Sequence, residues 1–185
     1  MYQVKKSTNG DFVVYEDIRE QIEEERLIKE RAVLGLVWQE LRLLYRPVIY
    51  IQTSDVYAVE TVIQWDFPGK SVLSEEKFMP IFQQYSIDIQ LGNFVLEEVC
   101  RQKSRWKDTE FSIIEFYVRL SGRFLLQKDS IAMIAQCMDK YGVSRREIQI
   151  CIEERDFWEN GEKMYDIANQ LISEGFRVAI NNFAS

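Results

Sequence analysis

The stretch that decides the fold is SIIEFYVRL, at residues 112–120. It is the first of three apolar, β-branched stretches, and two amphipathic stretches separate them. The strands are predicted at 112–120, 147–152 (EIQICI) and 177–183 (RVAINNF), and the helices at 130–141 and 157–174, each ended by a glycine (Gly142 and Gly175). Alternating strands and helices with short connections predict parallel strands joined by right-handed crossovers.

The sequence before this segment predicts further elements of the same kind. The strands are expected at 43–51 and 56–65, and the helices at 17–41, 75–85 and 88–105. Ser74 is the expected N-cap of the helix at 75–85, because its hydroxyl can accept from free backbone N–H groups. The long helix at 17–41 carries an apolar stripe between charged residues and needs a partner surface.

The predicted fold class is α/β, a partial (β/α)₈ barrel with about five strands and a long N-terminal helix. A complete barrel takes roughly 200 residues or more, and the alternation from Leu43 onward stops short of closure. An apolar parallel strand at an open edge favours association.

Composition excludes several classes of function. The chain has 185 residues and a net charge of −7, so it lacks the basic balance typical of nucleic-acid-binding proteins. It contains no histidine, which excludes histidine acid/base catalysis, Ser-His-Asp triads and His-ligated zinc. Three dispersed cysteines fit a reduced, cytoplasmic protein. No apolar run reaches the roughly 18–20 residues of a membrane-spanning helix.

Seven short motifs occur in a fixed order. They are YRPV at 45–48, YAVETVIQW at 57–65, FMP at 78–80, LGNFVLEEVC at 91–100, VRLS at 118–121, ICIEE at 150–154 and VAINNF at 178–183. Together they resemble the motifs of EAL domains, the family of cyclic di-GMP phosphodiesterases, over residues 36–185. This resemblance implies a TIM-type barrel of the EAL kind.

The N-terminal residues carry a second, shorter resemblance. MYQVKK at 1–6, Asn9-Gly10 and FVVY at 12–15 are similar to the closing helix and strand of a GGDEF domain. We therefore predict a GGDEF-like remnant at 1–15, a connector helix at 16–41 and an incomplete EAL-like domain at 42–185. On this interpretation the chain is a natural remnant, a product of a frameshifted gene, or a fragment of a longer GGDEF–EAL protein.

The EAL resemblance implies phosphodiester hydrolysis with two Mg²⁺ or Mn²⁺ ions held by oxygen ligands. Among the positions that it assigns to ligands, Glu60 keeps a carboxylate. The other positions carry a cation, a thiol or a neutral amide: Arg119, Cys151, Asn181 and Asn182. One carboxylate does not assemble a two-metal site, so we expect no catalytic residue, no metal site and no cofactor. Cys151, without a histidine partner, is interpreted as a core thiol.

The resemblance also gives three candidate ligand-binding residues: Arg46, Glu60 and Gln64. Gln64 stands where the family has a phosphate-facing arginine, so a bidentate contact is lost. Arg46 or Arg119 could pair with a phosphate, or either could occupy the emptied metal site beside Glu60. We expect Arg119 to pair with Glu60 there. Glu60 could equally be a residual polar residue at a strand end.

Six further charged positions are interpreted without a functional role. Arg101, Lys103, Arg105 and Lys107 are expected to form a solvated helix end. The adjacent Glu153 and Glu154 are expected on opposite faces of one strand.

The favoured interpretation is a catalytically inactive EAL-like signalling or scaffold module related to cyclic di-GMP signalling. Its expected partner is another protein, or a second copy bound through the N-terminal helix or the open barrel edge. The alternatives are a cyclic di-GMP phosphodiesterase, a non-hydrolysing receptor for cyclic di-GMP, which we favour less, and a gene remnant without function. We expect no nucleic-acid partner, no membrane span and a cytoplasmic location.

Overall fold

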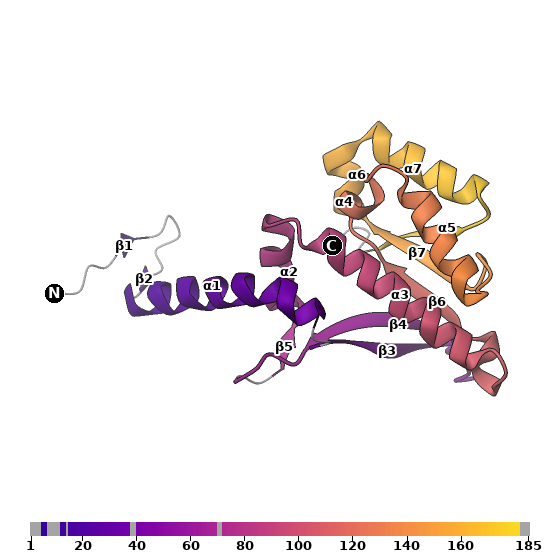
Figure 1. Cartoon of the computed structure of the whole chain (residues 1–185), viewed down its shortest axis with the longest axis horizontal. Coiled ribbons are helices and arrows are strands. Elements are labelled where there is room, and N and C mark those ends of the chain that lie inside the picture. The colour runs from indigo at the N-terminus through magenta and orange to yellow at the C-terminus, as the bar shows by residue number, and fades with distance from the viewer. Residues whose placement is uncertain (1–4, 7–11, 14, 38–39, 70–71, 182–185) are drawn as a thin grey trace.

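The protein has a mixed α/β architecture. The computed structural model describes residues 5–6, 12–13, 15–37, 40–69 and 72–181 (Figure 1). The elements, in chain order, are β1 (Lys5–Lys6), β2 (Phe12–Val13), α1 (Tyr15–Val37), β3 (Leu41–Ile49), β4 (Val56–Trp65), β5 (Leu73–Ser74), α2 (Glu75–Gln84), α3 (Asp88–Trp106), the 3₁₀ helix η1 (Glu110–Ile113), β6 (Glu115–Arg119), α4 (Gly122–Leu125), α5 (Ser130–Tyr141), β7 (Ile148–Glu153), α6 (Glu154–Asn160), α7 (Glu162–Ser173) and β8 (Arg177–Asn181).

One six-stranded sheet organises most of these elements, with the order β3-β4-β6-β7-β8 and the short β5 paired to β4. β3 and β4 form an antiparallel hairpin. From β4 onward the long strands are parallel, as the alternation of strands and helices predicts. The five expected strands are therefore confirmed, and β5 adds a sixth, two-residue strand.

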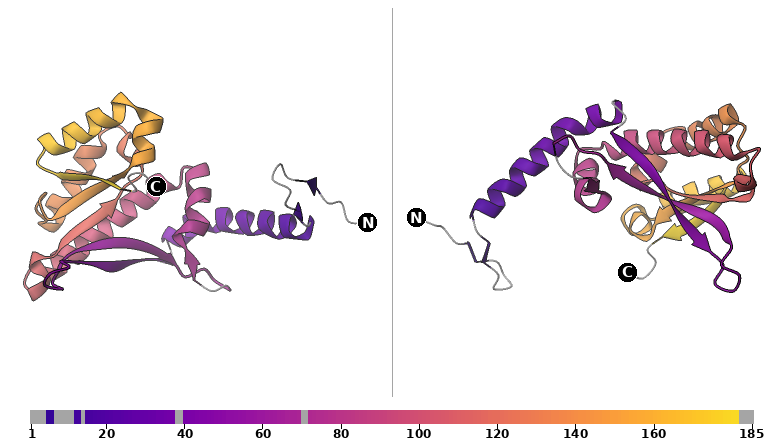
Figure 2. Two further views of the ribbon diagram at one scale, coloured as in Figure 1. Left: turned by 180° about the vertical axis from the view of Figure 1, so that it is seen from behind. Right: turned by 90° about the horizontal axis from the view of Figure 1, so that it is seen from below.

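Helices α3, α5 and α7 cover one face of this sheet (Figures 1 and 2). Between the helices and the sheet lies the apolar core, which includes Trp65, Phe116 and Phe124, each 0–1% exposed. Along β4 the side chains that face the helices are buried in alternation with half-buried ones. This alternation is the period of a strand with one covered face.

The other face of the sheet is polar and half exposed. One row of register partners crosses the whole sheet, from Arg46 through Glu60, Tyr117 and Gln149 to Arg177. All five side chains retain partial or full exposure. A closed barrel packs layers of bulky apolar side chains at such positions, so this face has the composition of a surface.

Helix α1 extends away from the sheet (Figures 1 and 2), and the buried side chains described for it lie in its C-terminal half. Ile28 and Ala32 are buried where α1 packs on α2, whereas Ile22 is 61% exposed. Glu40 fixes this end, because it accepts hydrogen bonds from Arg31 at 2.5 Å and from the Trp65 indole at 3.2 Å. Every helix in the described ranges is too short or too polar to cross a lipid bilayer.

Two of the expected helices have different limits. The first ends at Val37, and Leu41 already belongs to β3. The helix expected at 157–174 is two helices, α6 and α7, because Gly161 between them has a positive φ of 51° that ends the first. Glu154 begins α6, so the expectation that it shares a strand with Glu153 is wrong.

Two smaller expectations are also corrected. Residues 110–113 form η1, so β6 begins at Glu115 rather than Ser112. Ser74 does occupy the N-cap position of α2, with extended backbone, but its side chain makes no capping hydrogen bond.

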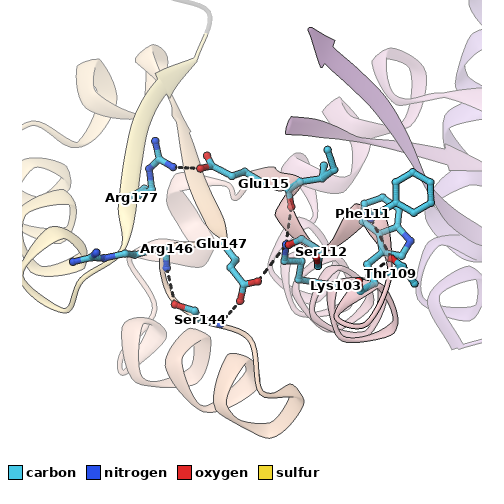
Figure 3. A network of polar contacts seen from close by, with 11 residues as sticks. Lys103, Thr109, Phe111, Ser112, Glu115, Ser144, Arg146, Glu147 and Arg177 are labelled. Atoms are coloured by element: carbon cyan, nitrogen blue, oxygen red, sulfur yellow. Dashed lines mark hydrogen bonds and ion pairs between the residues drawn. The ribbon is translucent and has the colours of Figure 1, made fainter. Parts of the chain in front are cut away.

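A buried lysine connects the amino-terminal ends of β6 and β7 (Figure 3). Lys103 is 3% exposed and donates to the carbonyl oxygens of Ser112 at 2.6 Å and Ile114 at 2.7 Å. It also pairs with Glu147 at 3.2 Å. The interpretation of Lys103 as part of a solvated helix end is therefore wrong, because its ammonium group replaces water with two carbonyls and a carboxylate.

Candidate functional site

The candidate site lies at the carboxyl ends of the parallel strands, where (β/α) barrels place their functional residues. Arg119 is the register partner of Cys151, and Glu153 is that of Asn181. Glu60 reaches the same region from β4 and acts on the Cys151 thiol electrostatically. The structure thus brings Glu60, Arg119 and Cys151 together. Asn181 ends β8 at the same edge, and Asn182 lies outside the described residues.

Glu60 is paired with Arg46, its register partner on β3. The Arg46 guanidinium donates to one Glu60 oxygen from Nη2 at 2.6 Å and from Nε at 3.2 Å. The hydrogen bond to Glu60 raises the pKa of Arg46 further above its usual range. The expected pair between Arg119 and Glu60 is therefore wrong, and Arg46 is the cation beside this carboxylate.

Arg119 pairs instead with Glu75, the first residue of α2. Its Nη2 lies 2.9 and 2.8 Å from the two Glu75 oxygens. Burial raises the pKa of Glu75, and the charge of Arg119 opposes this shift. The buried Nε of Arg119 has no hydrogen-bond partner. Sequence reasoning missed Glu75, because a glutamate at a helix start is already explained by the helix dipole.

Cys151 is 8% exposed, which confirms its interpretation as a core thiol. Burial, assisted by the charge of Glu60, raises the pKa of Cys151 to about 11. The thiol is therefore protonated at neutral pH. A neutral thiol is neither a nucleophile nor a ligand for a hard cation.

The Gln64 side chain contacts Asp66, the residue that follows β4. Its amide nitrogen donates to Asp66 at 3.2 Å, and Asp66 also pairs with Arg42. The Gln64 side chain is thus engaged locally rather than free to hold a phosphate.

An open groove of about 580 Å³ runs along these strand ends. Its charged lining consists of three arginines and three glutamates: Arg46, Arg119, Arg155, Glu75, Glu76 and Glu153. Arg155 pairs with Glu153 at 3.2 Å, so each of the three arginines already contacts a carboxylate. Arg155 and Glu153 were not among the predicted ligand-binding residues.

Below the groove lies a small cavity of about 60 Å³, which Asp88 and Asp156 help to line. Asp156 accepts from the Gly122 N–H at 3.0 Å, and burial raises its pKa. Asp88 is 3% exposed, and neither of its oxygens has a hydrogen-bond partner. Its nearest cation is Arg123, at 3.9 Å. The Asp156 carboxylate lies so close to the backbone at residue 122 that only glycine fits there. A Cβ at Gly122 would lie 2.5 Å from an Asp156 oxygen.

The described donor set does not fit a pair of divalent ions. Mg²⁺ and Mn²⁺ require several oxygen ligands with net negative charge. Here Glu60 and Glu75 are each neutralised by an arginine, and Cys151 carries no charge at neutral pH. Within the described ranges, no group of three or more acidic or cysteine side chains is arranged to hold a metal ion.

Two curated relatives are similar over most or all of this chain. The oxygen sensor protein DosP of Escherichia coli (strain K12) is 23% identical over 165 residues, which are 86% of this chain and 21% of DosP. The bifunctional diguanylate cyclase/cyclic di-GMP phosphodiesterase MucR of Pseudomonas aeruginosa is 20% identical over 100% of this chain and 27% of its own length. The chain therefore spans about a quarter of the length of these relatives.

Solved structures show the same fold. The PaMucR phosphodiesterase in complex with c-di-GMP superposes with a TM-score of 0.80 at 20% identity, over 85% of this chain and 64% of that one. The EAL domain of FimX from Pseudomonas aeruginosa, bound to c-di-GMP, gives a TM-score of 0.74 at 14% identity, over 85% and 62%. These EAL neighbours have a TIM-barrel-like fold. The EAL domain family profile matches residues 30–185, and the chain belongs to the EAL domain family.

Proposed function

We propose that this chain is a catalytically inactive EAL module of cyclic di-GMP signalling that acts through protein contacts. The observation that carries the proposal is the pair of arginine–carboxylate contacts at the strand ends. Arg46 holds Glu60 at 2.6 Å, and Arg119 holds Glu75 at 2.8 Å. Both guanidiniums are cations in the region where phosphodiester hydrolysis would need metal ions.

The chemistry of hydrolysis explains why these contacts matter. A two-metal site generates hydroxide from bound water and stabilises charge on the phosphoryl oxygens. A guanidinium cannot lower the pKa of a water molecule by direct coordination, and it repels a nearby cation. Arg119 stands at a position that the EAL resemblance gives to a metal ligand. It therefore opposes metal binding in two ways: it supplies no ligand oxygen, and its positive charge repels a metal cation.

The protein-contact part of the proposal is supported by exposed apolar side chains. Ile22 and Val33 of α1 are 61% and 49% exposed, and Ile51 at the β3–β4 turn is 91% exposed. On β8, the last strand of the sheet in the described part of the chain, Ile180 is 48% exposed. Apolar side chains at a free helix face and a free sheet edge favour association.

A hydrolysis assay tests the catalytic part. The chain is incubated with cyclic di-GMP and Mg²⁺ or Mn²⁺, beside Glu60→Ala and the matched control Glu76→Ala, an exposed groove residue. We expect no turnover from any of the three proteins. Turnover by the unaltered chain and by the Glu76→Ala protein, lost in the Glu60→Ala protein, would show that the module is an enzyme.

Light scattering after size exclusion tests the contact part. We expect self-association that weakens in Val33→Asp if α1 forms the interface, or in Ile180→Asp if the edge of β8 does. A chain that is monomeric at every concentration would exclude the second copy as the partner.

A non-hydrolysing receptor for cyclic di-GMP is the second candidate, favoured by the three arginines that line the groove. A phosphate diester pairs well with arginine forks. Each arginine already contacts a carboxylate, however, and a ligand would have to displace Glu60, Glu75 or Glu153. Calorimetric titration with cyclic di-GMP tests this candidate, and heat that disappears in Arg155→Ala but persists in Lys107→Ala would support it over the scaffold.

A further inference from the structure

The small cavity below the groove has an excess of negative charge in its lining. The lining includes four carboxylates and two guanidiniums, from Glu75, Asp88, Glu153, Asp156, Arg119 and Arg155. Arg119 pairs with Glu75 at 2.8 Å. Arg155 pairs with Glu153 at 3.2 Å. The two remaining carboxylates, of Asp88 and Asp156, therefore have no guanidinium of the lining to neutralise them.

Asp88, the first residue of α3, is buried without a hydrogen-bond donor. It is 3% exposed, and neither of its carboxylate oxygens has a hydrogen-bond partner. Arg123 approaches one of these oxygens only to 3.9 Å, its side chain is 50% exposed, and its guanidinium donates to the Gln83 carbonyl. A buried carboxylate that has lost its water and gained no donor is strongly unfavourable. A ligand that supplies positive charge inside the cavity would remove this cost.

Further oxygen atoms line the cavity beside Asp88. Asp156 of α6 is 8% exposed, and its described hydrogen bond is the one from the Gly122 N–H, at 3.0 Å. The hydroxyls of Thr61 on β4 and Ser121, the N-cap of α4, lie in the same lining. The Thr61 hydroxyl donates its proton to a backbone carbonyl at 3.3 Å, so its oxygen keeps free lone pairs. The cavity thus collects oxygen donors from four elements.

We propose that this cavity binds one divalent cation, Ca²⁺ or Mg²⁺, with Asp88 and Asp156 as its charged ligands. Two carboxylates balance a charge of +2, and oxygen is the ligand atom that both ions take. The cavity volume of about 60 Å³ exceeds the roughly 10–15 Å³ that a single water molecule needs. The ion therefore has room to keep several of its water molecules, as Mg²⁺ in particular requires.

This site is different from the two-metal site that the EAL resemblance implies. The positions given to metal ligands by that resemblance carry Glu60, Arg119, Cys151 and two asparagines, and neither Asp88 nor Asp156 is among them. The ion would have a structural role, because it would join the start of α3 to α6. Such a site works independently of the proposed signalling function.

Thermal unfolding of the full chain tests the proposal. The protein is treated with EDTA, dialysed, and then melted in increasing CaCl₂ or MgCl₂, with KCl at the same ionic strength as the control. A ligand that binds only the folded state stabilises it in proportion to the logarithm of its concentration. At a hundredfold excess over the dissociation constant, we expect the melting temperature to rise by roughly 5–10 °C. Calorimetric titration should give one ion per chain, and the ion with the lower dissociation constant is the preferred ligand.

Variants assign the ion to this cavity. Asp88→Asn and Asp156→Asn keep the shape of each side chain and remove its charge, so both should abolish the rise. Asp55→Asn, at an exposed position outside the cavity, is the matched control and should keep it. The proposal would be overturned by an equal rise in Asp88→Asn, by an equal rise in KCl, or by neither heat nor a rise with either divalent ion.

Discussion

Arg119 and Arg46 show how exposure decides the energy of an ion pair. Both guanidiniums contact a glutamate within 3 Å. The side chain of Arg119 is 28% exposed and that of Glu75 is 18% exposed, whereas Arg46 is 66% exposed. Water screens the Arg46 pair, and burial leaves Glu75 dependent on its partner.

This difference gives a matched pair of substitutions. Arg119→Leu should lower the free energy of unfolding by about 1–3 kcal/mol, because a buried carboxylate loses its cation. Arg46→Leu should change it by less than about 1 kcal/mol. Urea denaturation measures both. Equal losses would mean that the exposure of the two pairs is not what separates them.

Asp156 gives a pH-dependent prediction at the same scale. Burial raises its pKa in the folded state, so the folded protein binds this proton more tightly than the unfolded chain does. Its contribution to stability is present at low pH and is lost as the pH rises through the raised pKa. Asp156→Asn keeps an oxygen acceptor for the Gly122 N–H and removes the charge.

The stability of Asp156→Asn relative to the unaltered chain should therefore increase from acid to neutral pH. Denaturation at a series of pH values measures this difference, and Asp55→Asn, at an exposed position, is the control. A difference that stays constant with pH would contradict the role given to burial.

The sequence could place Glu60, Arg119 and Cys151 at one edge of the sheet because consecutive strand ends follow from the alternation of elements. It could not give their partners. The pairing of Arg119 with Glu75 depends on how α2 packs against the sheet. No local pattern in the amino-acid sequence indicates that packing. Lys103 shows the same limit. Its position in the sequence is that of a charged residue near a helix end, but its ammonium group donates to the carbonyls of Ser112 and Ile114, in and just after η1.

At the scale of elements, the packing of α3 on α4 requires a glycine. A Cβ at Gly92 would lie 2.6 Å from the ring of Phe124, which is 1% exposed. Gly92→Ala should gain helix propensity but lose more through the clash, with a net destabilisation of about 1–3 kcal/mol. Asn93→Ala, at the next and exposed position of α3, is the control for propensity. A stabilised Gly92→Ala protein would show that Phe124 moves freely.

The contacts of Lys103 hold three elements together and can be tested in the same way (Figure 3). Lys103→Met keeps much of the buried stem but leaves the carbonyls of Ser112 and Ile114 without their donor. We expect a loss of about 3 kcal/mol in the free energy of unfolding. The exposed Lys107→Met should change it little, and equal effects would contradict the burial of Lys103.

Element limits were predictable where glycine or apolar periodicity marks them, as for α5 and β4, which match residue for residue. The division between α6 and α7 was missed, because a single glycine inside a helical pattern is compatible with a continuous helix. The end of α1 was missed because Leu41 fits both the helical stripe and the alternation of β3.

For the whole molecule, the strand order predicts a gradient of local stability. Among the strands that the structure describes, β6 and β7 each have neighbours on both sides, whereas β8 has one. Amide hydrogen exchange should be faster in β8 than in β7 by roughly tenfold or more, because an edge strand opens without breaking the rest of the sheet. Mass spectrometry of peptides from each strand measures this. Equal protection would indicate that something covers the edge.

Helix α1 has a mechanical consequence. Its 23 residues form a rod about 35 Å long, clamped at one end through Glu40 and packed there on α2. The first residue of α2 is Glu75, the counter-ion of Arg119. A tilt of the N-terminal end of α1 would therefore be transmitted, through the contact between α1 and α2, to the charged residues that line the groove.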